Sequence, residues 1–425
     1  MSSSKQKSNR HSSVVAQHDP FAALRFRDYR LFTIGRLLLF TGSQMQTVAI
    51  GWELYERTGS ALVLGGVGLA QVLPMIALTL IAGHVADRRD RKLTMLLSVM
   101  LLALCSLALA VLSYTQGVVF LIYACLVLTG VAKAFLKPAS DALMWQLIPT
   151  SAFTNAATWN SSSFQLASVI GPALGGFGIA LLGNATGVYV AAAIAALLCF
   201  ILTLAITEKK GIRVTEPISI KALAAGAKFV WENQLILAAI TLDMFAVLLG
   251  GAVALLPIFA KDILHVGPVE LGYLQAANSI GALTMAITLA YLPPLRKAGP
   301  ALLWSVVGFG VVTIIFGLSR SFWLSILMLI LAGALDSISV VIRHTLVQIR
   351  TPDSLRGRVA AINSVFISAS NELGGFESGL TAALFGPVVS VVGGGIGTIL
   401  VVIATAIIWP GIRKLGALQE YKVSE

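Results

Sequence analysis

The sequence carries few charges for its length. Of its 425 residues only 12% are charged and 57% are hydrophobic, and the mean hydropathy is +0.87. A soluble chain of this length would form two or three domains with charged surfaces, and 30 basic and 19 acidic residues are too few to cover them. The composition excludes an ordinary soluble protein. It predicts a polytopic helical membrane protein, in which each span uses about 20 apolar residues.

Cysteines and catalytic motifs are also scarce. The three cysteines, Cys105, Cys125 and Cys199, all lie inside apolar runs, so we expect no disulfide framework. Neither a His-Glu-x-x-His motif nor a Gly-x-x-x-x-Gly-Lys-Ser/Thr phosphate loop occurs. The longest polar connection, residues 207–232, is too short for a soluble catalytic domain. We therefore expect no enzyme, no cofactor and no metal.

Apolar runs divide the chain into two sets of six. They lie near 29–52, 60–86, 93–113, 117–140, 153–182 and 186–206, then near 233–260, 268–291, 299–318, 322–348, 358–385 and 388–410. This pattern predicts an all-α polytopic membrane protein with twelve transmembrane helices in two pseudo-symmetric six-helix bundles. The expected parts are an N-terminal tail 1–28, a bundle 29–206, a central loop 207–232, a second bundle 233–410 and a C-terminal tail 411–425.

The distribution of Lys and Arg predicts the orientation in the membrane. With the N-terminus inside, 23 of these residues fall on the cytoplasmic side and only Arg57, Lys261 and Arg320 fall on the other. Both termini are therefore expected in the cytoplasm. The net charge of +11 is a topology signal rather than a nucleic-acid footprint, and lipid headgroups are the expected anionic partners. The first 20 residues contain no apolar segment, so we expect no cleavable signal peptide.

An internal repeat relates the two sets of runs. A shift of about 203 residues takes Gly130 to Gly333 and Pro149 to Pro352, so the fourth and tenth runs share their Gly-to-Pro spacing. One run later, the same shift superimposes Gly171, Gly176, Ala180, Leu181 and Gly183 on Gly374, Gly379, Ala383, Leu384 and Gly386. Parallel repeats of this kind are typical of transporters that rock around a site near the membrane midplane.

The connection after the second run carries a recognisable motif. It reads Gly83-His-Val-Ala-Asp-Arg-Arg-Asp-Arg-Lys92, which resembles the signature loop of the major facilitator superfamily. The twelve-span, two-half layout extends this resemblance over nearly the whole chain, and it implies the fold of that superfamily. By resemblance, contacts of this loop close the cytoplasmic side when the cavity faces out; the gating residues would be Gly83, Asp87, Arg88, Arg91, Asp141 and Arg358. The alternative is that the basic residues serve as topology determinants only.

A second motif lies in the fifth run. Gly171-Pro172-Ala-Leu-Gly175-Gly176 resembles the Gly-Pro-x-x-Gly-Gly motif of the exporters in this superfamily, although small residues at these places also serve ordinary helix packing. Two further segments resemble the branch of drug:proton antiporters and enterobactin exporter-like proteins. They are 52–59, Trp-Glu-Leu-Tyr-Glu-Arg-Thr-Gly, and 350–374, which runs from Arg-Thr-Pro to Asn-Glu-Leu-Gly.

Ionisable residues inside apolar runs are costly and usually mark a pathway or a pair. The repeat takes Lys133 in the fourth run to Asp336 in the tenth, so opposite charges occupy equivalent positions. By resemblance these two runs line a central cavity, and we expect Asp336 to gain and lose a proton there. The alternative is a static ion pair or two separate local pairs. Glu372 and Asp243 are further candidates for proton coupling.

Other polar residues are candidates for contact with a substrate. Arg36, Gln44, Lys137, Asn278 and Arg343 lie within apolar runs, and the basic members suit an anionic or catecholate-like compound. Each could equally satisfy a neighbouring helix, and the spacing of Lys137 and Asp141 favours a local pair.

The function that follows is transport driven by a gradient. The leading hypothesis is a proton-coupled exporter, in the bacterial inner membrane, of an amphiphilic organic compound that is siderophore-like or drug-like. The next alternative is an importer of a nutrient or a lysophospholipid transporter with the same fold; a membrane-embedded enzyme or receptor is a remote one. Expected partners are a small-molecule substrate, protons and membrane lipids, but no nucleic acid. We expect a monomer.

Overall fold

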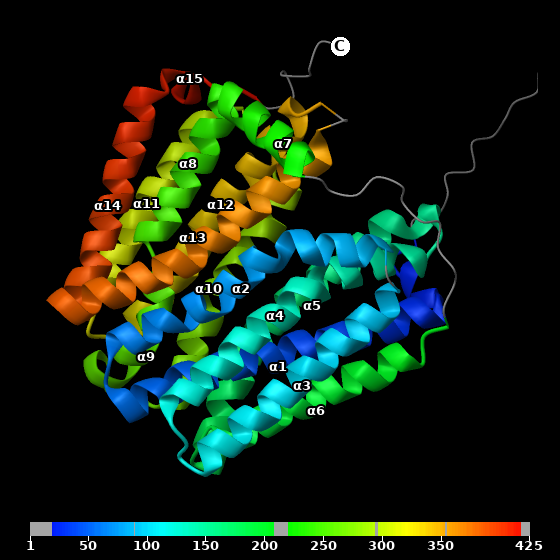
Figure 1. Cartoon of the computed structure of the whole chain (residues 1–425). Helices are drawn as coiled ribbons and strands as arrows, with labels where there is room; N and C mark the ends of the chain where they lie inside the picture. Colours follow the sequence, from blue (N-terminus) through cyan, green and yellow to red (C-terminus); the bar gives the residue numbers. More distant parts are fainter. Residues whose placement is uncertain (1–18, 89, 208–219, 294–295, 353–354, 418–425) are drawn as a thin grey trace, which may run out of the picture.

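The computed structural model describes residues 19–88, 90–207, 220–293, 296–352 and 355–417, which form two helical bundles (Figure 1). The first bundle consists of α1 (Arg27–Thr58), α2 (Ala61–Arg88), α3 (Arg91–Tyr114), α4 (Val119–Gln146), α5 (Phe153–Leu182) and α6 (Thr186–Leu204), with short 3-10 turns at Ala23–Arg25 and Thr150–Ala152. Two of these helix ends have well-defined caps. The Asp90 carboxylate accepts from the Leu93 amide at the start of α3, and Gly59 closes α1 with a left-handed backbone.

The second bundle follows the amphipathic helix α7 (Ile220–Glu232). It consists of α8 (Gln234–Leu249), η3 (Ala252–Leu255), α9 (Leu256–Ile258), η4 (Phe259–Ile263), α10 (Pro268–Tyr291), α11 (Ala298–Leu318), α12 (Phe322–Arg350), α13 (Arg356–Phe385) and α14 (Pro387–Ile408), with α15 (Pro410–Arg413) at its end. In Figure 1, α7 and α15 lie at the same end of this bundle.

The helix packing of the first bundle recurs in the second. In the first, α1 packs on α5 and α6, α2 on α4, and α3 on α4 and α6. In the second, α8 packs on α13 and α14, α10 on α12, and α11 on α12 and α14. Each pair in one bundle has its counterpart six spans later in the other, so the described spans form two related halves.

The seventh span is not one continuous helix, contrary to the expectation for 233–260. α8 ends at Leu249, and Gly250 and Gly251 separate it from η3, α9 and the π-helical η4. Two consecutive glycines weaken a helix, and Pro257 cannot donate the backbone hydrogen bond of an uninterrupted one. Broken spans in membrane proteins occur where the freed backbone faces protein or a water-filled cavity.

The two halves meet mainly through α2 with α13 and α5 with α10. Gly65 and Gly379 bring α2 and α13 together, since a Cβ added at Gly65 would lie 3.0 Å from the Cα of Gly379. Gly176 and Gly272 do the same for α5 and α10, where the equivalent distance is 3.1 Å. Small residues let helix backbones approach closely in a membrane, and Figure 1 shows α2 and α13 side by side.

These contacts lie towards one end of the molecule. We call the end where α1 begins the terminal side and the end where α1 ends the far side. One apolar cluster combines residues of both halves at the far side, among them Leu54, Tyr189, Phe259 and Phe316. Towards the terminal side, each half has its own apolar cluster. The cluster of the first half includes Tyr29. The halves therefore share a core at the far side and have separate cores at the terminal side.

Nine helical segments of the described residues are long and apolar enough to cross a membrane. Of the twelve spans, α1, α10 and α13 fall short of that hydropathy. These three helices carry polar residues such as Gln44, Gln275, Asn278 and Glu372. The same residues line the cavity described next, so the polar side chains of these three helices face a cavity inside the protein.

Candidate functional site

A cavity of about 530 Å³ lies between the two halves. Its volume falls in the range of small-molecule sites, which measure about 300 to 1,000 Å³. The polar and charged residues that line it come from α1, α2 and α4 in the first half and from α10, α12 and α13 in the second: Gln44, Thr47, Gln71, Lys133, Gln275, Asn278, Asp336, Asn371 and Glu372. Glycines and aliphatic side chains complete the lining, with Phe309 as its one aromatic member among the described residues.

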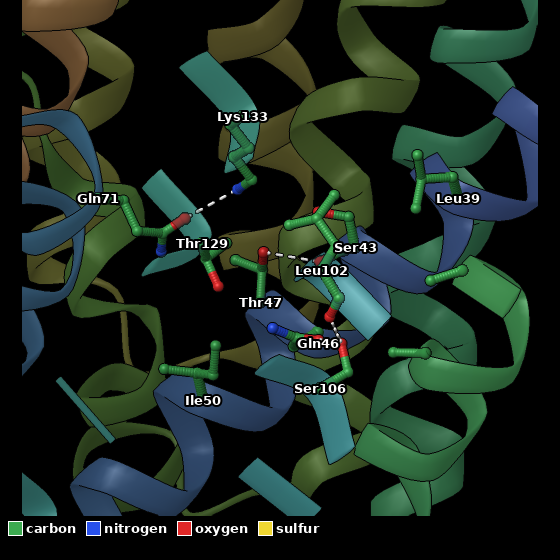
Figure 2. Close-up of a pocket in the computed structure, with 12 residues that line it drawn as sticks. Leu39, Ser43, Gln46, Thr47, Ile50, Gln71, Leu102, Ser106, Thr129 and Lys133 are labelled. Atoms are coloured by element: carbon green, nitrogen blue, oxygen red, sulfur yellow. Dashed lines mark hydrogen bonds between the residues drawn. The ribbon is translucent and has the colours of Figure 1, made fainter. Parts of the chain in front are cut away.

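Lys133 projects from α4 between this cavity and a smaller polar pocket inside the first half. Its ammonium donates to Oε1 of Gln71 on α2 at 2.8 Å, as Figure 2 shows. Ser106 and Gln46, which hydrogen-bond each other at 2.7 Å, line the smaller pocket together with Thr129. Lys133 thus has a neutral direct partner, and Glu372 on the other half is the carboxylate that acts on it electrostatically.

Asp336 lies on the wall of the same cavity, on α12. The charged groups that act on it are Asp243 and Arg343, and these two form a buried ion pair between α8 and α12. Asp243, which has no partner along the sequence, therefore has one across helices. In the part of the chain that the structure describes, Lys133 and Asp336 form no ion pair with each other. They share a cavity, and each has different charged neighbours: Glu372 for Lys133, and the Asp243–Arg343 pair for Asp336.

Three of the basic substrate candidates lie elsewhere. Arg36 reaches Asp141 at 3.3 Å and stacks near the rings of Phe32 and Phe40, and Lys137 reaches the same carboxylate at 3.5 Å. Arg343 is held by Asp243. None of the three belongs to the described lining of the cavity, whereas Gln44 and Asn278 do. Arg36 is mostly buried and Arg343 is buried, and a carboxylate within reach avoids the cost of an unpaired buried charge. Lys137 is exposed and forms the local pair that its spacing from Asp141 favours.

The two acidic residues of α13 separate as their spacing predicts. Glu372 lines the cavity, while the carboxylate of Glu377 accepts from the hydroxyl of Thr381 at 2.7 Å on its own helix. A separation of five residues turns about 140° around a helix, so both cannot face one cavity.

The signature loop is only partly described. Gly83 lies in α2, and the side chains of Asp87 and Arg88 lie outside the described residues. Arg91 donates to the backbone carbonyl of Ala142 at 3.4 Å rather than to a carboxylate. Asp141, one of the expected gating residues, pairs with Arg36 and Lys137.

At the start of α13, Arg358 packs beside α7. A Cβ added at Gly226 would lie 3.2 Å from the Cβ of Arg358. The central connection and the second half therefore meet at this expected gating residue.

The Gly-Pro-x-x-Gly-Gly segment lies at two helix interfaces. Gly171 and Gly175 face α1, where a Cβ added at Gly175 would lie 2.8 Å from the carbonyl oxygen of Met45. Gly176 faces α10 in the other half, and the carbonyl of Pro172 lies against Gly272 of the same helix. The segment thus joins α5 both to its own half and to the opposite one.

A contact between the halves at the far side was not foreseen from the sequence. The Tyr55 hydroxyl donates to the Asp262 carboxylate, and the Lys261 ammonium lies 6.0 Å from the ring of Trp52. Trp52 and Tyr55 belong to the 52–59 segment, whose family resemblance was the available signal. We call these four residues the far-side latch.

The same segment also anchors α1 within its own half. Glu53 is buried and accepts from the hydroxyl of Tyr189 on α6 at 2.7 Å, and it pairs with Arg57. Arg57 in turn donates to the backbone carbonyls of residues 112, 113 and 117 at the end of α3. The α1 side of the far-side latch is therefore joined by hydrogen bonds to α6 and to the end of α3.

The site has no feature of a metal centre. Among the described residues, no group of three or more His, Cys, Asp or Glu side chains could hold a metal ion. The lining instead offers amide groups, two carboxylates and one ammonium to a small molecule.

Comparison with known proteins places this architecture. A family model described as transmembrane secretion effectors, within the major facilitator superfamily, matches residues 18–417. The multidrug efflux pump Tap of Mycolicibacterium fortuitum is 27% identical over 358 residues, covering 81% of this chain and 86% of the pump. The enterobactin exporter EntS of Citrobacter koseri is 25% identical over 417 residues, covering 95% and 94%.

A solved structure of a POT family transporter has the same fold. It matches with a TM-score of 0.73 at 13% identity, over 91% of this chain and 96% of that one. This likeness confirms the predicted all-α fold class, and the family match confirms the resemblance inferred from the signature loop. The chain belongs to the transmembrane secretion effector family of the major facilitator superfamily, and it is a multi-pass membrane transporter with distant homology to drug efflux pumps and enterobactin exporters.

Proposed function

We propose that this protein exports an amphiphilic organic compound across the bacterial inner membrane in exchange for protons, by alternating access. The observation that carries the proposal is a cavity that contains ionisable groups and lies between two halves whose shared core is at one end only. Such halves can rock about the cavity, because breaking the far-side contacts leaves each half with its own terminal-side core.

The distribution of basic residues supports a cytoplasmic terminal side. In that orientation both termini are cytoplasmic, the far-side latch faces the periplasm, and a cargo enters the cavity from the cytoplasm. The Gly-Pro-x-x-Gly-Gly segment and the relatives named as exporters support transport outward. The protein works as a monomer in this scheme, because both walls of the cavity belong to one chain.

Asp336 is the proton carrier in this mechanism. It lies on the cavity wall, where water can reach it, and it is close enough to the buried Asp243–Arg343 pair for the three charges to influence one another. Protonation of Asp336 removes one negative charge from the wall and weakens its attraction for a cation. Glu372 is a second carboxylate that can take this role, because it faces Lys133 across the cavity.

Transport into inverted membrane vesicles tests this function. The expected result is accumulation of a labelled substrate when the vesicle interior is acid, with collapse of the pH gradient as the substrate enters. A protonophore should abolish both signals. Vesicles from cells with an empty vector are the control. Substrate accumulation only in right-side-out vesicles would contradict export and favour an importer of the same fold.

A further inference from the structure

The two walls of the cavity carry opposite charges. The first half contributes Lys133, and the second half contributes Asp336 and Glu372. Within the described lining these are the three charged residues, since Arg36, Lys137 and Arg343 are engaged in ion pairs elsewhere. An anion alone would meet two carboxylates, and a cation alone would meet an ammonium.

These charges are not cancelled by direct pairing. Lys133 is held by the neutral amide oxygen of Gln71 at 2.8 Å, which orients its ammonium without neutralising it. Among the described residues, neither Asp336 nor Glu372 forms an ion pair within 4.0 Å. Lys133 forms the positive pole of the cavity, and Asp336 and Glu372 form its negative pole. Each pole can therefore bind a ligand group of the opposite charge.

Amide side chains occupy the surface between the poles. Gln44, Gln71, Gln275, Asn278 and Asn371 all line the cavity. In the part of the chain that the structure describes, the carboxamides of Gln44, Gln275 and Asn278 form no hydrogen bond with protein. A purely apolar ligand would displace the water bound to these carboxamides without replacing its hydrogen bonds. Burying an unsatisfied polar group costs free energy. The lining favours a ligand with hydroxyl or amide groups.

We propose that the cargo is a zwitterion, whose anionic group binds Lys133 and whose cationic group binds Asp336 or Glu372, with hydrogen-bonding groups between them. Gln71 is then a specificity-determining residue, because its amide oxygen orients the Lys133 side chain without neutralising it. A bound zwitterion links the two halves by its two charges, which suits a cargo that must be enclosed during rocking. This inference rests on the proposed function, since it assumes that the cargo binds in this cavity.

Binding of matched charge forms tests the inference. Three scaffolds of increasing size serve as probes: tyrosine, alanyl-glutamine and alanyl-glutaminyl-tyrosine. Each is used as the zwitterion, as the C-terminal amide, as the N-acetyl anion and as the doubly blocked neutral form. The readouts are the thermal shift and the dissociation constant of the purified full chain in detergent, without a pH gradient.

At least one zwitterion should bind about tenfold or more tightly than its three companions, because each charged hydrogen bond lost costs roughly that factor or more. Tighter binding of any other charge form overturns the proposal. It is equally overturned if no form of any scaffold shifts the melting temperature.

Variants that change the charge of the lining test the inference through the order in which the four charge forms bind. Misfolding would weaken binding of all forms but would not change this order. Lys133→Gln should move the preference from the zwitterion to the amide cation. Asp336→Asn combined with Glu372→Gln should move it to the N-acetyl anion. Gln71→Glu pairs Lys133 internally, so it should weaken the zwitterion about tenfold while the cation is affected less. Lys228→Gln, on the exposed face of α7, is the matched control and should keep the wild-type order. Unchanged order in all three test variants contradicts the assignment.

The vesicle assay separates this inference from the proposed function. If the N-acetyl anion or the amide cation binds best and is accumulated, export stands and the zwitterion fails. If the zwitterion binds best but never accumulates in acid-interior vesicles, the class of ligand stands and export fails.

Discussion

At the scale of single residues, the environment of a charge decides its role more than its position in the sequence. Lys133, Asp336 and Glu372 lie on the cavity wall, where they can meet water, a proton or a ligand. Asp243 and Arg343 are buried together and serve each other. Removing one partner of such a buried ion pair lowers the stability of the protein strongly, because it leaves one uncompensated buried charge.

Removing the titratable group at position 336 should uncouple transport from protons. An amide in Asp336→Asn keeps the size of the side chain but cannot release or take up a proton. We expect substrate accumulation in inverted vesicles to fall more than tenfold and proton movement to disappear, while substrate binding is retained. Asp336→Glu, which keeps the carboxylate, should retain coupling. Full proton-driven activity in Asp336→Asn would remove Asp336 as the carrier.

Breaking the buried pair should destabilise the second half. Asp243→Asn leaves Arg343 charged and buried without its carboxylate, at a cost of about 3–5 kcal/mol. Thermal unfolding of the purified protein, followed by tryptophan fluorescence, should show a clear fall in the melting temperature. The double variant Asp243→Leu with Arg343→Met should recover most of it, because both charges are then absent. Equal melting temperatures for the wild type and the single variant would contradict a stabilising pair.

At the scale of helices, glycine positions decide which elements approach one another. α2 meets α13 and α5 meets α10 through small residues, and these are the main contacts between the halves. The broken seventh span has the same origin, because Gly250 and Gly251 both stop α8 and line the cavity. Sequence patterns reveal such glycines but not the helix that each one faces.

A larger side chain at one of these contacts should loosen the far side. In Gly176→Val the new Cβ would lie 3.1 Å from the Cα of Gly272 and against the backbone at Pro268, so α5 and α10 must separate. We expect transport to fall severalfold, with greater far-side access of a maleimide to a cysteine placed at Leu271, which is fully buried in the far-side cluster. Gly393→Val is the control, because a Cβ there meets nothing within 4 Å. Similar behaviour of the two variants would show that the α5–α10 contact is not the cause.

At the scale of the whole molecule, the arrangement of the cores is the one expected for one of the two states in the proposed alternating-access cycle. The halves share an apolar cluster at the far side and keep separate clusters at the terminal side, as the diverging bundles in Figure 1 also indicate. The far-side latch adds a polar bridge to that shared core. Its energy bears directly on the balance between the two states.

Weakening the far-side latch should shift this balance. Tyr55→Phe removes a hydrogen bond to a carboxylate, a contact that contributes roughly 1.5–3 kcal/mol, so the far-open state should gain at least tenfold in relative population. Spin labels at Thr115→Cys and Ser321→Cys, both exposed, report the distance between the halves. The native cysteines are all buried, which limits background labelling. Tyr114→Phe is the exposed control. An unchanged distance distribution in Tyr55→Phe would contradict the role of this contact.

The amino-acid sequence was enough to predict the class of this protein and its framework of spans. Apolar runs must be buried in lipid, so their number and length predict the spans, and the 203-residue repeat predicts two related halves. The signature loop and the glycine motif were sufficient for the superfamily. Polar groups inside apolar runs are costly, so the sequence also identifies five unusual residues: Lys133, Asp336, Glu372, Gln44 and Asn278.

Which of these groups meet depends on how the helices pack. Charges pair with whatever lies within a few ångströms, and those neighbours come from helices distant in the sequence. Arg343 pairs with Asp243, Arg36 pairs with Asp141, and Lys133 donates to Gln71. No local sequence pattern could reveal these three contacts. The same holds for the far-side latch. Its partners lie more than 200 residues apart, and only the packing of two halves brings them together.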